Sequence, residues 1–103
     1  KDTYFIRTII YNDKKIGVVG LKNIEEEDAE YWGYIGEKDF RGLGVGKIMI
    51  DYIVKISTEL SLERIYLKVI KDNMLAISLY KKKGFIIKNE VGNEYLMTKK
   101  LND

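Results

Sequence analysis

Short runs of apolar residues separated by turn residues predict that the chain begins with strands. Residues 1–11 are rich in β-branched and aromatic side chains, and residues 15–24 form a second run of the same kind. The Asn-Asp-Lys sequence at 12–14 is typical of a turn, so we expect the two runs to form a hairpin. Gly17 and Gly20 inside the second run indicate a bulge or a close neighbour at that point.

The apolar pattern changes from strand to helix in the middle of the chain. Residues 29–35 are expected to form a third strand. Residues 44–60 carry apolar side chains at every third or fourth position, which predicts an amphipathic helix. Its predicted core face consists of Val45, Ile48, Met49, Tyr52, Ile53, Ile56 and Leu60. Its predicted solvent face consists of Lys47, Asp51, Lys55 and Glu59.

A strand and a second, shorter helix are expected next. Residues 64–70 should lie parallel to the third strand, because a helix connects the two. Asp72-Asn73 then supplies an N-cap for a helix over residues 74–83. Gly84 follows that helix and is expected to end it as a C′ glycine.

The last two strands complete an α+β fold. Residues 85–91 and 94–100 are expected to form a closing hairpin around Gly92-Asn93. The predicted order ββ-β-α-β-α-ββ gives a mixed, mostly antiparallel sheet with a central parallel pair and two helices. With 103 residues and a mass of 12.0 kDa, the chain is expected to form one domain, residues 1–103, around one core.

Composition excludes several kinds of chemistry. The chain has no cysteine, which excludes disulfides and a thiolate nucleophile, and no histidine, the usual metal ligand and general base. Four consecutive acids at 25–28 do not face one point, so a solvated loop is favoured over a metal cluster there. We therefore predict no metal site.

Charge and hydropathy limit the partners. A formal net charge of +2 is too small to indicate nucleic acid as the main partner. No apolar run approaches the 18 residues of a membrane span, and the first residues do not resemble a signal peptide. We expect a cytoplasmic domain that binds neither nucleic acid nor a membrane.

Residues 40–49 form the most informative stretch of the sequence. Arg41, Gly44 and Gly46 have the spacing R-x-x-G-x-G and lead directly into the predicted helix. Glycines let backbone N–H groups approach a ligand closely, and a helix start adds unpaired donors and the positive end of the helix dipole. This combination predicts an anion-binding site.

Two common phosphate-binding patterns do not fit this stretch. A Walker A loop would require glycine in place of Arg41 and Ser or Thr in place of Ile48. A Rossmann loop would require glycine in place of Met49. The R-x-x-G-x-G spacing resembles the pyrophosphate-binding motif of the GCN5-related N-acetyltransferase (GNAT) family, which holds acetyl-coenzyme A. A glycine turn that only joins a strand to a helix stays open as the alternative at this point.

A second motif supports the same family. Residues 69–85 resemble the pattern V-x-x-x-N-x-x-A-I-x-L-Y-x-x-x-G-F, which in GNAT enzymes follows the fifth strand. Residues 34–42 look most like the subgroup that acetylates ribosomal-protein N-termini, polyamines or nucleotide-linked amino sugars. In one respect the chain departs from the family, which usually has a strand and one or two helices before the first hairpin. The chain is therefore expected to be either a fragment or a minimal form with an open acceptor site.

The resemblance implies which residues contact the coenzyme. The amides of residues 43–46 would hold the pyrophosphate, and the strand end would present backbone groups to the pantetheine arm where the sheet splays. Arg41 and Lys47 either screen the phosphates or are solvated. The expected coenzyme-binding residues are Ile35, Gly36, Arg41, Gly42, Leu43, Gly44, Val45, Gly46, Lys47, Asn73 and Tyr80.

Acetyl transfer requires a neutral amine, a donor for the oxyanion and a proton for the leaving thiolate. A backbone N–H near Ile35 is the expected oxyanion donor. Tyr80 matches the family position that protonates the thiolate, and the alternative is a core tyrosine. Glu30 is the candidate base acting through water, and the alternative is a solvent-facing strand residue. Asn73 is expected to cap its helix and also to contact the coenzyme or a water.

Two functions follow from these expectations. The first is an N-acetyltransferase that moves an acetyl group from acetyl-coenzyme A to a primary amine by direct transfer, because no cysteine is present to form an acyl-enzyme. The second is a non-catalytic module or subunit that binds acyl-coenzyme A. An open sheet would also expose apolar surface and strand edges, so we expect a homodimer with exchanged strands as a possible assembly.

Overall fold

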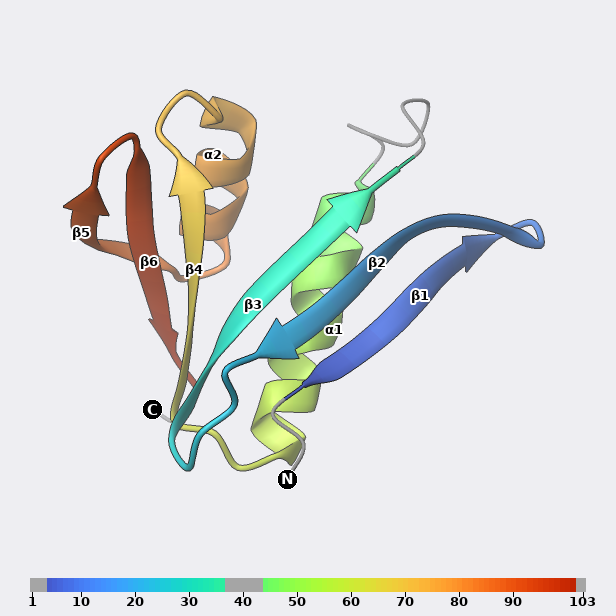
Figure 1. Cartoon of the computed structure of the whole chain (residues 1–103), viewed down its shortest axis with the longest axis horizontal. Coiled ribbons are helices and arrows are strands. Elements are labelled where there is room, and N and C mark those ends of the chain that lie inside the picture. The colour runs from blue at the N-terminus through green and yellow to red at the C-terminus, as the bar shows by residue number, and fades with distance from the viewer. Residues whose placement is uncertain (1–3, 37–43, 102–103) are drawn as a thin grey trace.

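The computed structural model describes residues 4–36 and 44–101 and has the predicted order of elements (Figure 1). The elements are β1 (Phe5–Tyr11), β2 (Lys14–Lys22), β3 (Asp28–Ile35), α1 (Val45–Glu59), β4 (Arg64–Ile70), α2 (Met74–Lys82), β5 (Ile86–Val91) and β6 (Glu94–Lys100).

The six strands form one mixed sheet in the order β1-β2-β3-β4-β6-β5. All neighbouring strands are antiparallel except β3 and β4, which are parallel and central. Both helices lie behind the sheet in Figure 1, so the opposite face carries no helix among the described residues. We call this second side the open face. The predicted α+β fold with a central parallel pair is confirmed.

The parallel pair β3–β4 holds together at one end only. Its residue pairs run from Asp28–Arg64 to Glu30–Tyr66, and the two strands diverge beyond that point (Figure 1). The sheet therefore consists of two halves, β1–β3 and β4–β6, which separate toward the carboxyl ends of β3 and β4. The predicted splay of the sheet is present.

The core fills the space between the sheet and the helices. Strand residues alternate between the two faces, so every second side chain points toward α1 and α2. The buried cluster consists of Val19, Leu21, Ala29, Tyr31, Met49, Ile50, Ile53, Leu62, Ile65, Leu67, Val69, Ile77, Phe85 and Met97.

The predicted core face of α1 is wrong in part. Met49 and Ile53 are buried, but Ile48 is 67% exposed, and Ile50 is fully buried although it was not predicted to be. The remaining helix residues of the predicted face are half-buried and pack against the core, so the buried stripe is displaced toward Ile50 rather than moved to another face. Leu60 is 48% exposed because it lies past the helix end as the C-cap. Apolar residues outside the predicted stripe, such as Ile50, border it, and the position of the sheet decides which edge of the stripe is buried.

The turns and their glycines lie where the sequence predicted, and the turn bounds differ by one residue. Asn12 and Asp13 have positive φ angles of 50° and 64° and make the β1–β2 turn alone, so Lys14 already belongs to β2. The β1–β2 register shifts between Ile9 and Ile10, which confirms a bulge beside Gly17. Gly84 has a φ of 94° and follows α2, as predicted. No helix in the described part of the chain is long and apolar enough to span a membrane.

Candidate active site

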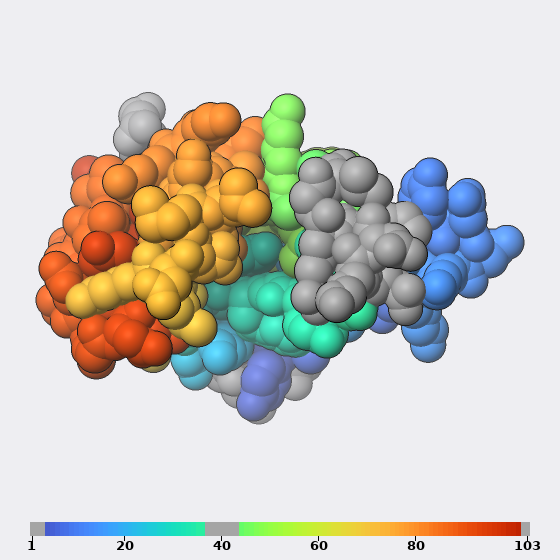
Figure 2. Space-filling model, turned by 90° about the horizontal axis from the view of Figure 1, so that it is seen from above, coloured from blue at the N-terminus to red at the C-terminus, as the bar shows by residue number. Residues whose placement is uncertain are grey.

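Two pockets meet where β3 and β4 diverge. The helix-side pocket has a volume of about 550 Å³ and lies among the end of β3, the start of α1 and the exposed side of α2. Its lining is Tyr31, Gly33, Tyr34, Ile35, Gly44, Gly46, Lys47, Met49, Asn73, Leu75, Ala76, Leu79 and Tyr80. Seen from above in Figure 2, the surface of β4 and α2 and the surface of β3 and α1 border a hollow between the two halves.

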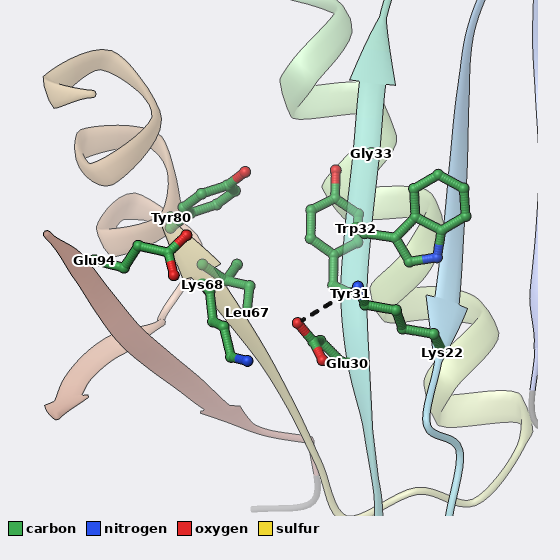
Figure 3. Close-up of a pocket in the computed structure, with 9 residues that line it drawn as sticks. All are labelled: Lys22, Glu30, Tyr31, Trp32, Gly33, Leu67, Lys68, Tyr80 and Glu94. Carbon is green, nitrogen blue, oxygen red and sulfur yellow. Dashed lines mark ion pairs between the residues drawn. The ribbon is translucent and has the colours of Figure 1, made fainter. Parts of the chain in front are cut away.

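The second pocket lies on the open face and is drawn in Figure 3. This open-face pocket has a volume of about 310 Å³, and its lining is Lys22, Glu30, Tyr31, Trp32, Gly33, Leu67, Lys68, Tyr80 and Glu94. Three residues, Tyr31, Gly33 and Tyr80, line both pockets. The gap in the sheet is thus reached from both faces, and these three residues surround it.

The start of α1 presents unpaired donors to the helix-side pocket. Gly44 is the N-cap with a φ of 84°, and it makes no side-chain cap bond. The first turn contains no acid, and the first helical bond runs from Ile48 N–H to the Gly44 carbonyl at 3.2 Å. The N–H groups of Val45, Gly46 and Lys47 therefore have no partner within the helix. Together with the helix dipole, they form a site suited to an anion.

Glycine at position 46 also lets the two helices approach each other. A Cβ on Gly46 would lie 3.3 Å from Leu79 Cδ2 of α2. The start of α1 and the middle of α2 therefore form two adjacent walls of the helix-side pocket.

The backbone of β3 presents alternate N–H groups to the gap. The Gly36 N–H donates to the Ile16 carbonyl at 2.8 Å, so the even-numbered positions near the end of β3 bond to β2. On the other side, the Glu27 carbonyl accepts from Arg64 N–H at the start of β4. Because bonding direction alternates along a strand, the N–H groups of Gly33 and Ile35 point toward the side from which β4 has diverged.

Glycine at position 33 leaves room for two side chains that line the helix-side pocket. A Cβ at this position would collide with Met49 Cε and would lie 2.9 Å from Tyr31 Oη. Any larger residue would therefore displace the side chains that border the gap. Sequence reasoning missed Gly33, although a glycine inside a strand is a known signal of a close approach.

Tyr80 reaches the gap from α2. Its ring meets the ring of Tyr31 edge-on, with centroids 6.3 Å apart and an interplanar angle of 77°, and it also contacts Phe85. Burial raises the pKa of the Tyr80 phenol above its usual value. Burial, and secondarily the proximity of Tyr80, raise the pKa of Tyr31. Both phenols are therefore protonated at neutral pH and can donate.

Glu30 lies on the β3 wall of the open-face pocket (Figure 3). It is only 7% exposed, so the solvent-facing alternative is wrong. Asn23 Nδ2 donates to its Oε1 at 3.2 Å, and Lys22 Nζ lies 4.0 Å from its Oε2. The structure thus holds a buried carboxylate beside the gap, with one hydrogen-bond donor and one nearby cation.

The remaining predicted residues are distributed unevenly. Asn73 caps α2, since its Oδ1 accepts from Ala76 N–H at 3.2 Å, and it also lines the helix-side pocket. Gly36 and Val45 line neither pocket. Arg41, Gly42 and Leu43 lie outside the described residues.

Several lining residues were not identified from the sequence. Five residues of the open-face pocket come from the four strands β2, β3, β4 and β6, and no motif contains them. They are Lys22, Tyr31, Trp32, Lys68 and Glu94. Only the strand pairing brings them to one pocket.

The acids at 25–28 do not form a metal site. Glu27 and Asp28 lie 3.3 Å and 4.0 Å from the Arg64 guanidinium. Across residues 4–36 and 44–101, no group of three or more His, Cys, Asp or Glu side chains is arranged to hold a metal ion.

Comparisons with known proteins agree with this geometry. The family model described as "Acetyltransferase (GNAT) family" matches residues 1–85. The comparison with curated protein sequences gave no match. Many solved structures share the fold.

Three of these structures are representative. The N-acetyltransferase PseH from Campylobacter jejuni is 25% identical with a TM-score of 0.85, and the match covers 99% of this chain and 71% of PseH. The PaiA N-acetyltransferase from Thermoplasma acidophilum, solved with coenzyme A, is 24% identical with a TM-score of 0.85, covering 95% of this chain and 61% of PaiA. The spermidine/spermine N-acetyltransferase SpeG from Vibrio cholerae, solved as mutant forms, is 22% identical with a TM-score of 0.85, covering 97% and 68%.

Proposed function

Because the chain belongs to the acetyltransferase (GNAT) family, we propose that it transfers an acetyl group from acetyl-coenzyme A to a primary amine. The family resemblance inferred from the two sequence motifs is confirmed by the family model. The observation that carries the proposed reaction is the gap in the sheet, which Tyr31, Gly33 and Tyr80 border from both faces. Such a gap lets two substrates approach one point from opposite sides.

The helix-side pocket is the proposed site of acetyl-coenzyme A. The unpaired N–H groups at the start of α1 would hold the pyrophosphate, and Lys47 beside them adds a positive charge. The pantetheine arm would run along the end of β3, where the Gly33 N–H group faces the gap. A structural relative supports the choice of ligand, since PseH has been solved in complex with acetyl-coenzyme A.

The acetyl group would lie at the gap itself. The Gly33 N–H is the proposed donor to the thioester carbonyl oxygen and to the oxyanion that forms from it. Ile35, the donor expected from the sequence, lies on the same side of β3, two residues further from the point where β3 and β4 separate. The Gly36 N–H is already used by the Ile16 carbonyl and is not proposed as a contact.

The amine would enter from the open-face pocket. Its nitrogen attacks the carbonyl carbon, the C–S bond breaks, and the amide product and the thiolate of coenzyme A form. We propose that Tyr80 gives its proton to the thiolate and that Glu30, through a water, accepts the proton lost by the amine. Two protons are thereby transferred, one at each face of the gap, and no acyl-enzyme is needed.

The relatives indicate only the chemical class of the acceptor, which is an amine. SpeG acts on spermidine and spermine by its name, and polyamines, amino sugars and peptide N-termini are the acceptors to be tested here. The chain spans 71% of PseH and 61% of PaiA, so the activity of the whole protein is part of the proposal. A cytoplasmic location and a homodimer with exchanged strands stay predictions.

Calorimetry and a coupled thiol assay test this proposal together. We expect acetyl-coenzyme A to bind near the micromolar range, about −8 kcal/mol, and to be consumed in the presence of at least one amine. Binding without consumption of acetyl-coenzyme A by any polyamine, amino sugar or N-terminal peptide would favour the non-catalytic module. Absence of binding would contradict both functions.

A further inference from the structure

The open-face pocket carries charges of both signs. Lys22 and Lys68 supply two cations, and Glu30 and Glu94 supply two carboxylates. In Figure 3, Glu30 and Lys22 lie on the β2–β3 side of the gap, and Lys68 and Glu94 lie on the β4–β6 side. Each wall of the pocket thus has one cation and one anion.

The two walls differ in how far their charges are already satisfied. On the β2–β3 side, Glu30 accepts a hydrogen bond from Asn23 and lies within 4.0 Å of the Lys22 ammonium. On the β4–β6 side, neither Lys68 nor Glu94 forms an ion pair with any residue that the structure describes. This second wall therefore keeps one cation and one anion that a ligand can meet.

We propose that the acceptor is an amine that also carries an anionic group, a carboxylate or a phosphate, and that Lys68 receives this group. The inference rests on the proposed function, because it concerns the second substrate of the same site. A diamine can pair one ammonium group with Glu94, but its second ammonium group then lies near Lys68, where like charges repel. A zwitterionic amine pairs its anion with Lys68 and leaves its amino group facing the Glu30 and Glu94 carboxylates.

The expected preference is modest in size. Lys68 is exposed, and an ionic contact at such a position is screened by water and salt. We expect about a fivefold gain in affinity from one such contact. The preference should decrease as the salt concentration rises.

Three amines of equal chain length test the proposal: 4-aminobutanoate, 4-amino-1-butanol and 1,4-diaminobutane. Each is titrated by NMR into the protein saturated with coenzyme A, so that binding is measured without turnover. We expect 4-aminobutanoate to bind about fivefold more tightly than either of the others. Equal affinities, or tighter binding of the diamine, would overturn the proposal. Adding 3-aminopropyl phosphate distinguishes phosphate from carboxylate, and a preference for either anion over the alcohol supports it.

Variants assign the preference to one residue. Lys68→Glu should reverse it, so that the diamine binds more tightly than the amino acid. The control Lys100→Glu makes the same change of charge at a residue of β6 that lies outside the open-face pocket. This variant should retain the preference for 4-aminobutanoate. If Lys68→Glu does not fold, Lys68→Gln should make the three amines bind alike. A preference that persists in the folded Lys68 variant would overturn the assignment.

Turnover is measured separately on the same amines. If 4-aminobutanoate binds most tightly but no amine is acetylated, the result would contradict the proposed function and support the inference that Lys68 receives an anionic group. Acetylation with a preference for the diamine would support the proposed function and overturn the inference.

Discussion

The two sides of the gap in the sheet are built from different kinds of groups. The helix-side pocket depends on backbone N–H groups and on glycines at 33, 44 and 46: Gly33 and Gly46 leave space that a Cβ would fill, and Gly44 has a positive φ. The open-face pocket depends on charged side chains from β2, β3, β4 and β6. A constant ligand such as a pyrophosphate can be held by backbone, whereas an acceptor that varies among enzymes is met by side chains that can change without altering the fold.

This difference explains which part of the site carries a sequence motif. A backbone site needs glycine at fixed spacing before a helix, so it is visible in consecutive residues. A side-chain site needs only that strands distant in the chain lie next to each other. Variants on the two sides should therefore separate effects on coenzyme binding from effects on amine turnover.

Glu30→Gln on the open face should lower the rate of acetyl transfer strongly. Loss of a general base typically lowers the rate on the order of 10²- to 10⁴-fold, while acetyl-coenzyme A affinity should stay within about twofold because Glu30 does not line the helix-side pocket. Steady-state kinetics and calorimetry measure the two quantities. The matched control is Glu27→Gln, which removes only an exposed ion-pair partner of Arg64. A Glu30→Gln rate within threefold of the control would exclude Glu30 as the base.

Lys47→Glu on the helix side should weaken acetyl-coenzyme A binding about tenfold, or about 1.4 kcal/mol. An acid in the first turn interacts favourably with the helix dipole, so the melting temperature should not fall. The control Lys55→Glu makes the same change on an exposed position further along α1 and should leave binding unchanged. Equal affinities of the two variants for acetyl-coenzyme A would contradict an anion site at the start of α1.

The two tyrosines shared by both pockets should make stability depend on alkaline pH. Their pKa values are raised in the folded state, so above about pH 10 the unfolded chain loses protons that the folded chain keeps. The free energy of unfolding therefore keeps the full contribution of the two neutral phenols below about pH 10. Above that pH it decreases by about 1.4 kcal/mol per pH unit for each tyrosine. Urea unfolding at several pH values should therefore show a smaller decrease for Tyr31→Phe than for the unmodified protein. Identical pH profiles would show that the Tyr31 phenol is not held in its neutral form.

The sequence predicted the fold well because its signals are local. The turn at Asn12-Asp13, the cap at Asn73 and the glycine after α2 each follow from one or two residues, and all are present. The buried face of α1 was partly wrong because apolar residues lie on both edges of its buried stripe, and only the position of the sheet decides that Ile50 is buried and Ile48 is exposed.

The site was predictable only on its motif side. Gly44, Gly46, Lys47, Asn73 and Tyr80 lie together on the helix-side pocket, as the two motifs implied. Lys68 and Glu94 belong to strands that meet the β3 residues only through the sheet order β3-β4-β6. Nothing in the spacing of these residues indicates that pairing, so their place in the open-face pocket follows only from the topology.

The central claim is that Tyr80 acts as the acid at the gap, and one comparison of variants tests it most directly. Tyr80→Phe and Tyr31→Phe each remove one hydroxyl from the same pair of rings, and Tyr31 serves as the control because both phenols border both pockets. Single-turnover acetyl transfer is measured with acetyl-coenzyme A affinity measured alongside. We predict that Tyr80→Phe lowers the rate on the order of 10²- to 10⁴-fold with little change in affinity, and that Tyr31→Phe stays within tenfold of the unmodified protein. A Tyr80→Phe rate equal to that of Tyr31→Phe would contradict the claim.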